Sequence, residues 1–311
     1  MDNIKKGYIP VMLTPFKDSG EVDYDGLTKL IELYLESGVS GLFANCLSSE
    51  MYELSEPERL QVVGHVIKAV NGKVPVVATG SFGGPVAGQA EFIKKMHATG
   101  VDAVIVITGI MAGEAESDKI LNDRIFQLLQ LTGNIKLGLY ECPVPYKRVI
   151  TAEQLKEFVA TNRVTYLKDT SLDIGQVKAK LEAVKGYAGF GLYDAYMAHA
   201  VESLKAGSAG LSCIQGNFFP ELIIWLCEKY DDPGLTAEVA RVQQILRDNM
   251  EVVHDVYPII AKYFLQKRGL GISTYTRRQV GVFSPEVRMK IDKLYADFGR
   301  LQKELDIRSI I

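Results

Sequence analysis

A lysine that ends a short apolar segment is the side chain with the most distinctive chemistry in this sequence. Residues 164–167 (VTYL) lead directly into Lys168, and Asp169 follows. If the segment is a buried strand, burial disfavours the ammonium form of the lysine and lowers its pKa. A neutral amine attacks ketones and aldehydes and forms a Schiff base. The alternative is an ammonium paired with a neighbouring carboxylate such as Asp169, and position alone leaves both interpretations open.

A tyrosine has the corresponding position in another apolar segment. Residues 135–140 (IKLGLY) end at Tyr140, just before a proline-containing stretch. A phenol can donate and accept a proton within one hydrogen-bond network, although a lone tyrosine is more often a core aromatic. Neighbouring strands lie about 5 Å apart. If the two strands are adjacent, Tyr140 and Lys168 would therefore meet across a small ligand.

Two serines follow a third apolar segment. In residues 41–54 (GLFANCLSSEMYEL), Ser48, Ser49 and Glu50 come where the apolar run stops. Hydroxyl groups and free backbone N–H groups after a strand can hold a carboxylate. The alternative is a solvated turn before a helix. The glycine-rich residues 79–84 (TGSFGG) lack the spacing of a phosphate loop, so we expect no nucleotide site.

The elements that would position these residues alternate along the chain. Eight short apolar segments, rich in Val and Ile and poor in charge, read as strands buried on both faces. They are residues 8–13, 41–46, 74–79, 101–107, 135–140, 164–168, 187–191 and 209–214. Helical patterns separate them, which favours a closed (β/α)8 barrel over the alternative, a doubly wound sheet. Active sites of such barrels lie at the carboxyl ends of the strands, so the polar residues above would share one rim.

The last part of the chain has a different pattern. After about residue 230 the strand signal fades, and helices begin near Thr236, after Pro258 and at Ser284. We therefore predict a barrel that carries the active site over residues 1–230 and a helical appendage packed on it over residues 231–311.

Composition excludes several classes of protein. The 311 residues carry a net charge of -3 with no basic cluster, so nucleic acid is not an expected partner. No apolar run is long enough to span a membrane, and the N-terminus does not resemble a signal peptide, so we expect a cytoplasmic protein. The cysteines Cys46, Cys142, Cys213 and Cys227 form no CxxC motif and read as buried free thiols. The four histidines lack metal-site spacing, and we expect no metal.

Together these segments resemble the dihydrodipicolinate synthase / N-acetylneuraminate lyase family. The resemblance runs from about residue 7 to residue 220. It includes GYIPVMLTPF at the first strand and SSEMYELSEPERL after the second. Its most specific parts are GLYECPVPYKR, which contains Tyr140, and VTYLKDTS, which contains Lys168.

The resemblance implies a mechanism through a lysine imine. Lys168 would attack the ketone of pyruvate or a related 2-oxo acid, Tyr140 would move protons, and Ser48 would help to relay them. The substrate-binding residues that we assign are Ser48, Ser49, Ser212 and Gly191. The family mechanism needs neither a metal nor an organic cofactor. The resemblance also implies a homotetramer built as a dimer of dimers.

Departures from the family pattern bear on the substrate. The family's Gly-Thr-Thr-Gly-Glu motif aligns with residues 46–50, which places Leu47 at the first threonine. Residues 108–114 (TGIMAGE) lack the tyrosine that many members extend into a neighbouring subunit. Pro145 stands where true dihydrodipicolinate synthases carry an arginine for the second substrate, and Arg148 lies three residues on.

These departures lead to three functional hypotheses. The first is a lyase that cleaves, condenses or dehydrates a 2-keto-3-deoxy sugar acid or another hydroxylated 2-oxo acid. The second is 4-hydroxy-tetrahydrodipicolinate synthase activity on pyruvate and aspartate semialdehyde. The third is a degenerate member that binds a keto acid as a sensor.

Overall fold

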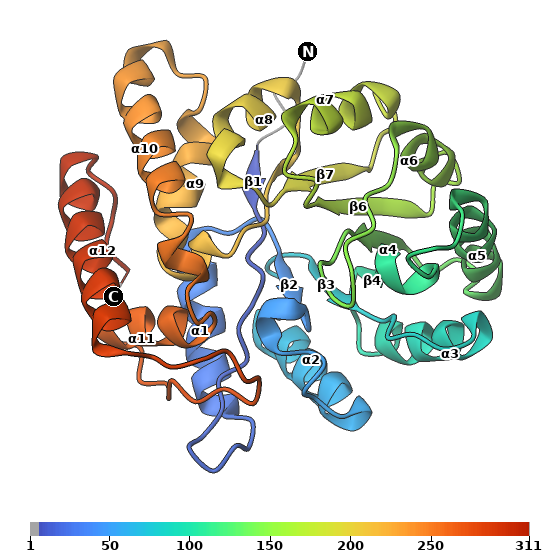
Figure 1. Ribbon diagram of the computed structural model, residues 1–311, viewed down its shortest axis with the longest axis horizontal. Helices are drawn as coiled ribbons and strands as arrows, with labels where there is room; N and C mark the ends of the chain where they lie inside the picture. Colours follow the sequence, from blue (N-terminus) through green and yellow to red (C-terminus); the bar gives the residue numbers. More distant parts are fainter. Residues whose placement is uncertain (1–5, 311) are drawn as a thin grey trace.

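Eight parallel strands form the centre of the molecule (Figure 1). The structure is a computed structural model that describes residues 6–310. The strands are β1 (Gly7–Tyr8), β2 (Leu42–Ala44), β3 (Val76–Thr79), β4 (Ala103–Ile107), β5 (Leu137–Tyr140), β6 (Val164–Asp169), β7 (Gly191–Asp194) and β8 (Gly210–Leu211). Their order in the sheet is β1-β8-β7-β6-β5-β4-β3-β2.

The sheet closes on itself beyond β1. Val11 forms a parallel bridge with Phe43 of β2. The Met12 amide donates to the Phe43 carbonyl at 3.0 Å, and the Phe43 amide donates to the Pro10 carbonyl at 3.0 Å. The predicted (β/α)8 barrel is therefore confirmed, because a doubly wound sheet would leave both edges open.

Helices surround the strands, and several begin at a capping side chain. The α-helices are α1 (Tyr24–Ser37), α2 (Glu56–Val70), α3 (Val86–His97), α4 (Thr108–Met111), α5 (Asp118–Leu131), α6 (Ala152–Val159), α7 (Ile174–Ala183), α8 (Ala200–Ala206), α9 (Pro220–Lys229), α10 (Thr236–Asp248), α11 (Ile259–Lys267) and α12 (Pro285–Glu304). The 3-10 turns are η1 (Leu47–Ser49), η2 (Met197–His199), η3 (Gln215–Asn217), η4 (Pro233–Leu235) and η5 (Val252–His254). Ser55 and Thr151 open α2 and α6 with complete capping boxes, which satisfy amides that helix starts leave unpaired.

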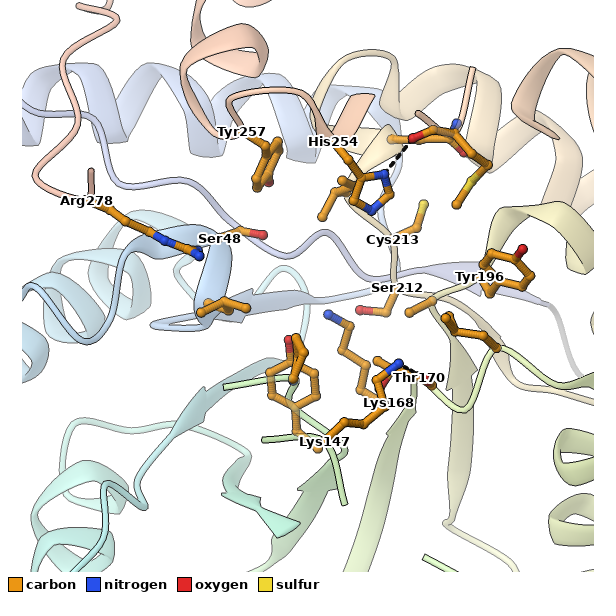
Figure 2. Close-up of a pocket in the computed structure, with 18 residues that line it drawn as sticks. Ser48, Lys147, Lys168, Thr170, Tyr196, Ser212, Cys213, His254, Tyr257 and Arg278 are labelled. Carbon is orange, nitrogen blue, oxygen red and sulfur yellow. Dashed lines mark hydrogen bonds between the residues drawn. The ribbon is translucent and has the colours of Figure 1, made fainter. Parts of the chain in front are cut away.

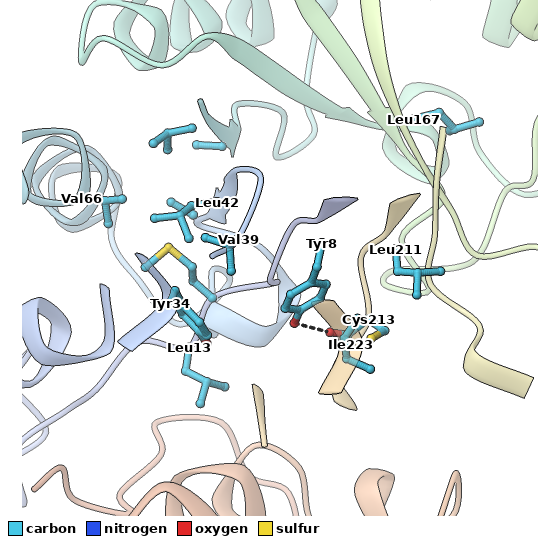
Figure 3. Packing of buried hydrophobic residues seen from close by; sticks show 14 of the residues in the cluster. Tyr8, Leu13, Tyr34, Val39, Leu42, Val66, Leu167, Leu211, Cys213 and Ile223 are labelled. Carbon is cyan, nitrogen blue, oxygen red and sulfur yellow. Dashed lines mark hydrogen bonds between the residues drawn. The ribbon is translucent and has the colours of Figure 1, made fainter. Parts of the chain in front are cut away.

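Two apolar cores follow from the alternation of side chains along each strand. The outer core fills the space between strands and helices, and Figure 3 shows part of it. There the Tyr8 hydroxyl donates to the Cys213 carbonyl at 3.1 Å, which ties β1 to the segment after β8. The inner core fills the barrel, where the ring of Phe43 packs edge-on against Tyr140 and Tyr166. The four cysteines are buried and free, as predicted.

The seventh strand lies later in the sequence than predicted. We expected it at 187–191, but β7 begins at Gly191 and runs to Asp194. In the sheet Gly191 pairs with Tyr166 and Asp194 pairs with Asp169, so the whole of β7 lies alongside β6. The apolar pattern misled because Leu192 is the only fully apolar side chain in the strand.

The C-terminal helices pack on one side of the barrel, beside α1 and α9 (Figure 1). Aromatic rings join two of them to the start of α9: Phe219, the N-cap of α9, stacks on Phe298 of α12 at 5.1 Å, and Phe264 of α11 lies 6.0 Å from Phe219. These helices therefore share the outer core of the barrel. Within residues 6–310 we find no helix with the length and apolarity that crossing a membrane requires.

Candidate active site

Lys168 and Tyr140 lie side by side at the carboxyl ends of two adjacent strands. Tyr140 ends β5, and its backbone pairs in register with Lys168 of β6. The Lys168 Nζ lies 4.4 Å from the centre of the Tyr140 ring. Both side chains point into the barrel and are at most 4% exposed. The two residues that the sequence singled out for imine chemistry therefore face each other.

The Lys168 amine has no acidic partner. No carboxylate lies within ion-pair distance of its Nζ in the part of the chain that the structure describes. Burial lowers the pKa of Lys168, and the thiols of Cys46, Cys142 and Cys213 oppose this shift only in part. This is the environment in which a lysine at neutral pH has a larger fraction of free amine.

The acid next to Lys168 in sequence faces the other way. Asp169 points outward from β6, and its carboxylate lies 2.6 Å from the Nζ of Lys180 on α7. Glu141, which follows Tyr140, also points outward and lies 2.5 Å from the same ammonium. The interpretation of Lys168 as the partner of Asp169 is therefore wrong, because successive side chains of a strand point to opposite faces.

The Tyr140 hydroxyl lies in an apolar and sulfur-rich environment. Burial raises the pKa of Tyr140 well above its ordinary value, and its hydroxyl is close enough to the Cys142 thiol to share a hydrogen bond. The phenol is therefore kept protonated and can act as a proton donor. On the adjacent strand β6, the hydroxyl of Tyr166 adds to this rise in pKa.

The two serines have separate roles. Ser48 lies in η1 beside Leu47, and both line the cavity described below. Its hydroxyl contacts the hydroxyl of Tyr257, which also accepts a hydrogen bond from Asn217 at 2.6 Å. Ser49 is turned behind the wall, because its hydroxyl donates to the Met12 carbonyl at 2.7 Å and accepts from the Cys46 amide at 3.0 Å. Ser48 is thus the serine that a ligand can reach.

Glu50, the third polar residue of that turn, fastens a distant part of the chain. Its backbone has the left-handed φ of 56°, which non-glycine residues seldom adopt. Its buried carboxylate accepts hydrogen bonds from the backbone amides of Arg277 and Arg278 at 2.7 and 2.9 Å. It also pairs with the buried Lys262 at 3.0 Å. Glu50 therefore holds the segment after α11 at the mouth of the barrel.

A cavity of about 450 Å³ opens above Lys168 (Figure 2). It is lined by Leu47, Ser48, Tyr140, Pro143, Lys147, Lys168, Thr170, Leu172, Ala195, Tyr196, Ser212, Cys213, Ile214, Gln215, Met250, His254, Tyr257 and Arg278. None of these residues is acidic. The cavity has the size of a small-molecule site, and its charge favours an anionic ligand.

Sequence reasoning missed the part of this cavity that comes from the C-terminal helices. Met250, His254, Tyr257 and Arg278 all lie beyond residue 230, so the lining of the cavity extends past the predicted barrel of residues 1–230. The ring of His254 hydrogen-bonds the Met250 carbonyl through Nδ1 at 2.6 Å. The irregular stretch 267–285, long for a loop within a compact domain, was the signal that a functional segment lay there.

The other assigned residues divide between the cavity and its surroundings. Ser212 lines the cavity, and its hydroxyl donates to the Ile9 carbonyl at 2.8 Å. Gly191 opens β7 and therefore lies at the opposite end of the strand from the cavity. Arg148 is turned away as well: its guanidinium donates to the Gly113 carbonyl at 3.0 Å and pairs with Asp118 at 2.8 Å.

Comparison with known proteins agrees with this geometry. The model of the dihydrodipicolinate synthetase family matches residues 5–297. A 4-hydroxy-tetrahydrodipicolinate synthase of Marinobacter nauticus is 24% identical over 270 residues, covering 85% of this chain and 89% of that protein. The probable 2-dehydro-3-deoxy-D-pentonate aldolase YjhH of Escherichia coli is 22% identical over 299 residues, covering 95% and 98%.

Solved structures share the fold. YagE, a prophage protein of the dihydrodipicolinic acid synthase family from E. coli K12, solved in complex with pyruvate, superposes with a TM-score of 0.84 at 22% identity, covering 94% of this chain and 98% of that one. CdNal from Clostridium difficile, solved in complex with mannosamine, superposes with a TM-score of 0.82 at 16% identity, covering 94% and 99%.

Proposed function

The chain belongs to the dihydrodipicolinate synthetase family of class I aldolase-type lyases, and we propose that it forms a Schiff base between Lys168 and a 2-oxo acid. The observation that carries this proposal is the Lys168 amine itself. It is buried, it has a lowered pKa and no carboxylate partner in the described chain, and it lies 4.4 Å from the Tyr140 ring. A lysine with no such task would be expected to have a paired charge.

The reaction begins with addition to the ketone. The Nζ lone pair forms a C–N bond to C2 of the 2-oxo acid, and the carbonyl oxygen leaves as water after it has received two protons. The raised pKa of Tyr140 keeps its hydroxyl protonated, so that it can donate to that oxygen. Ser48, whose hydroxyl contacts Tyr257, is the next hydroxyl group at the rim and would relay the proton.

The protonated imine then accepts electrons from the substrate. When the C3–C4 bond breaks, its electron pair moves into the imine and gives an enamine, while the C4 hydroxyl loses its proton and becomes an aldehyde. In a dehydration, C3 loses a proton and C4 loses its hydroxyl group as water. Both reactions proceed through the same lysine imine. The shape and polarity of the cavity would therefore determine which substrate is bound.

We propose a hydroxylated 2-keto-3-deoxy acid as the substrate. Gln215 lines the cavity, its Nε2 donates to the Leu246 carbonyl at 2.8 Å, and its Oε1 has no partner among the described residues. That oxygen is buried in the cavity wall, so a substrate hydroxyl would satisfy it only after the Gln215 amide turns toward the cavity. At the position where dihydrodipicolinate synthases carry their arginine, aspartate semialdehyde would meet no free cation, because Pro145 carries no charge and Arg148 is committed to Asp118.

The first test asks whether Lys168 forms the imine. The protein is incubated with pyruvate and borohydride, and the reduced adduct is located by mass spectrometry. We expect the adduct on Lys168, and we expect it to disappear in Lys168→Met. Lys147→Met is the matched control, since it removes another lysine of the same cavity and should retain the adduct. A protein without an adduct on Lys168 would have a different mechanism.

The second test identifies the reaction. Pyruvate release is measured with a panel of 2-keto-3-deoxy sugar acids, and loss of water is followed in parallel. Release of either product at a steady rate supports a lyase, and an adduct without turnover would indicate a sensor. Efficient condensation of pyruvate with aspartate semialdehyde would instead favour the synthase.

We also propose a cytoplasmic homotetramer built from two dimers, as the family resemblance implies. The four free thiols suit a reducing compartment. Sedimentation velocity of the purified protein would give the mass of the assembly, and a monomer at micromolar concentration would contradict the proposal.

A further inference from the structure

The cavity has more positive charge than a single carboxylate requires. Lys147 and Arg278 line it together with Lys168, and no acidic residue does so within the described chain. Once Lys168 has become an imine, a 2-oxo acid still brings its own carboxylate beside the reacting carbon. The remaining cations therefore exceed what the simplest 2-oxo acid can neutralise.

Among the cations that line the cavity, Arg278 is the one whose position the contacts within the described protein explain least. Figure 2 shows its side chain reaching from the C-terminal segment toward Ser48 and the centre of the cavity. The residue is half-buried, and its guanidinium has no carboxylate partner in residues 6–310. Lys147 differs, because it is exposed and its ammonium donates to the Thr170 carbonyl at 2.8 Å. Arg278 is thus placed to bind a ligand rather than the protein.

Buried hydrogen bonds hold the backbone of Arg278 in place, although it lies in a loop. Glu50 accepts from the amides of both Arg277 and Arg278, and Lys262 neutralises Glu50 from the other side. The side chain of Arg277 is fixed in turn by Glu58, to which its Nη2 donates at 2.7 Å. Such fixation reduces the entropy that a binding loop loses when its ligand arrives.

On the premise of the proposed function, we propose that Arg278 binds a second anionic group, a carboxylate or a phosphate, at the end of the substrate farthest from the ketone. Guanidinium groups form two parallel hydrogen bonds with such groups. The natural substrate would then be a 2-oxo acid with charge at both ends. Glu50 is the positioning residue of this arrangement, because it holds Arg278 without contacting the ligand.

The test compares ligands that carry a distal anion with a ligand whose distal group is neutral. The ligands are 2-oxoglutarate, its neutral 5-methyl ester, and a 2-keto-3-deoxy acid with a terminal phosphate. For each, we measure the concentration that gives half-maximal borohydride trapping on Lys168. We expect 2-oxoglutarate or the phosphate to be trapped at a concentration roughly 10- to 100-fold lower than the ester, since a hydrogen-bonded charge contributes on that scale. Whichever anion shows the larger ratio identifies the distal group.

Two variants decide whether Arg278 is responsible. Arg278→Gln should abolish the preference for the anionic ligand over the ester. Arg148→Gln is the matched control, because it removes an arginine that is turned away from the cavity and should leave the ratio unchanged. Equal trapping of anion and ester by the wild type, or a preference that survives in Arg278→Gln, would overturn the proposal.

A separate readout keeps this inference distinct from the imine mechanism. Calorimetric titration of 2-oxoglutarate and its ester into Lys168→Ala measures the distal preference without covalent chemistry. If pyruvate gives no adduct on wild-type Lys168, the imine mechanism fails, and calorimetry still reports on Arg278. An adduct on Lys168 together with equal calorimetric affinities would sink the role of Arg278 alone.

Discussion

Two lysines at opposite faces of the same strand show how partners decide the charge of a buried amine. Lys168 on the inner face of β6 and Lys180 on the outer side are both nearly inaccessible to solvent. Burial lowers the pKa of Lys168, and no carboxylate in the described chain opposes it. Burial acts on Lys180 too, but the carboxylates of Glu141 and Asp169 outweigh it and raise its pKa.

The difference comes from the alternation of side chains at two strand ends. β5 and β6 each end with an inward functional residue followed by an outward acid: Tyr140 and Glu141 in one, Lys168 and Asp169 in the other. The outer acids share Lys180, which joins the two strand ends where Tyr140 and Lys168 must stay together. In the proposed mechanism the inner residues Tyr140 and Lys168 carry out the chemistry. The outer cluster around Lys180 holds the two strand ends together.

The largest difference between the two lysines should appear when each amine is removed. Lys168 is the first case. Lys168→Met should lower the rate of pyruvate release by on the order of 10³-fold or more, because no other group forms the imine. Its free energy of unfolding should not fall, since the substitution removes an unpaired polar group from an apolar site. Turnover assays and urea unfolding measure the two quantities. A clear loss of stability would mean that Lys168 has a structural partner.

Lys180→Met should have the opposite signature. At pH 8 it leaves the two buried carboxylates of Glu141 and Asp169 without a cation, which should destabilise the fold by about 3–5 kcal/mol. Urea unfolding measures this loss. The triple variant Lys180→Met, Glu141→Gln, Asp169→Asn is the control and should regain much of the stability. A loss below about 1 kcal/mol in the single variant would show that the cluster does not join the strands as we infer.

Tyr140→Phe tests the inner face at its second residue. We expect the rate of pyruvate release to fall by about 10²-fold, because proton transfer by a positioned side chain contributes on that scale. The adduct on Lys168 should still form, more slowly. Tyr166→Phe is the matched control, since Tyr166 is another buried tyrosine of the barrel interior but does not line the cavity. Equal losses in both variants would assign the effect to packing.

Glu141→Gln should give the smallest effect, seen in the pH dependence of stability. Burial, and next the charge of Asp169, raise the pKa of Glu141 from 4.5 to about 7. Between these values the folded protein holds a proton that the unfolded chain has lost, so this group's contribution falls as pH rises. Relative to Glu141→Gln, the wild type should lose roughly 2–3 kcal/mol between pH 4.5 and pH 7. Parallel pH profiles for the two proteins would contradict the raised pKa.

The features of the fold that repeat along the chain could be predicted from the sequence. Eight apolar segments with helical patterns between them predicted the barrel, and the structure has eight strands separated by helices. The positions of Lys168 and Tyr140 at the rim were predictable because each ends an apolar segment, and the carboxyl ends of barrel strands meet at one rim. β7 was misplaced because Tyr193 and Asp194 interrupt its apolar pattern.

The rest of the site depended on contacts that no local pattern encodes. Whether Ser48 or Ser49 faces the cavity is decided by the hydrogen bond from Ser49 to the Met12 carbonyl. The direction of Arg148 is decided by Asp118, and the presence of Arg278 by Glu50. These partners are far apart in sequence, and the irregular stretch that contains Arg278 offered only its length as a signal.

The hydrogen bond between Glu50 and the amide of Arg277 joins an early part of the chain to a late one, so it can form only near the end of synthesis. The two residues are 227 positions apart. At synthesis rates of about 5–20 residues per second, roughly 10 to 45 seconds separate their emergence from the ribosome. The strands that carry Tyr140 and Lys168 are translated within that interval. During biosynthesis Lys168 is therefore translated well before the segment that completes the mouth of the barrel, so the cavity can gain Arg278 only at a late step of folding.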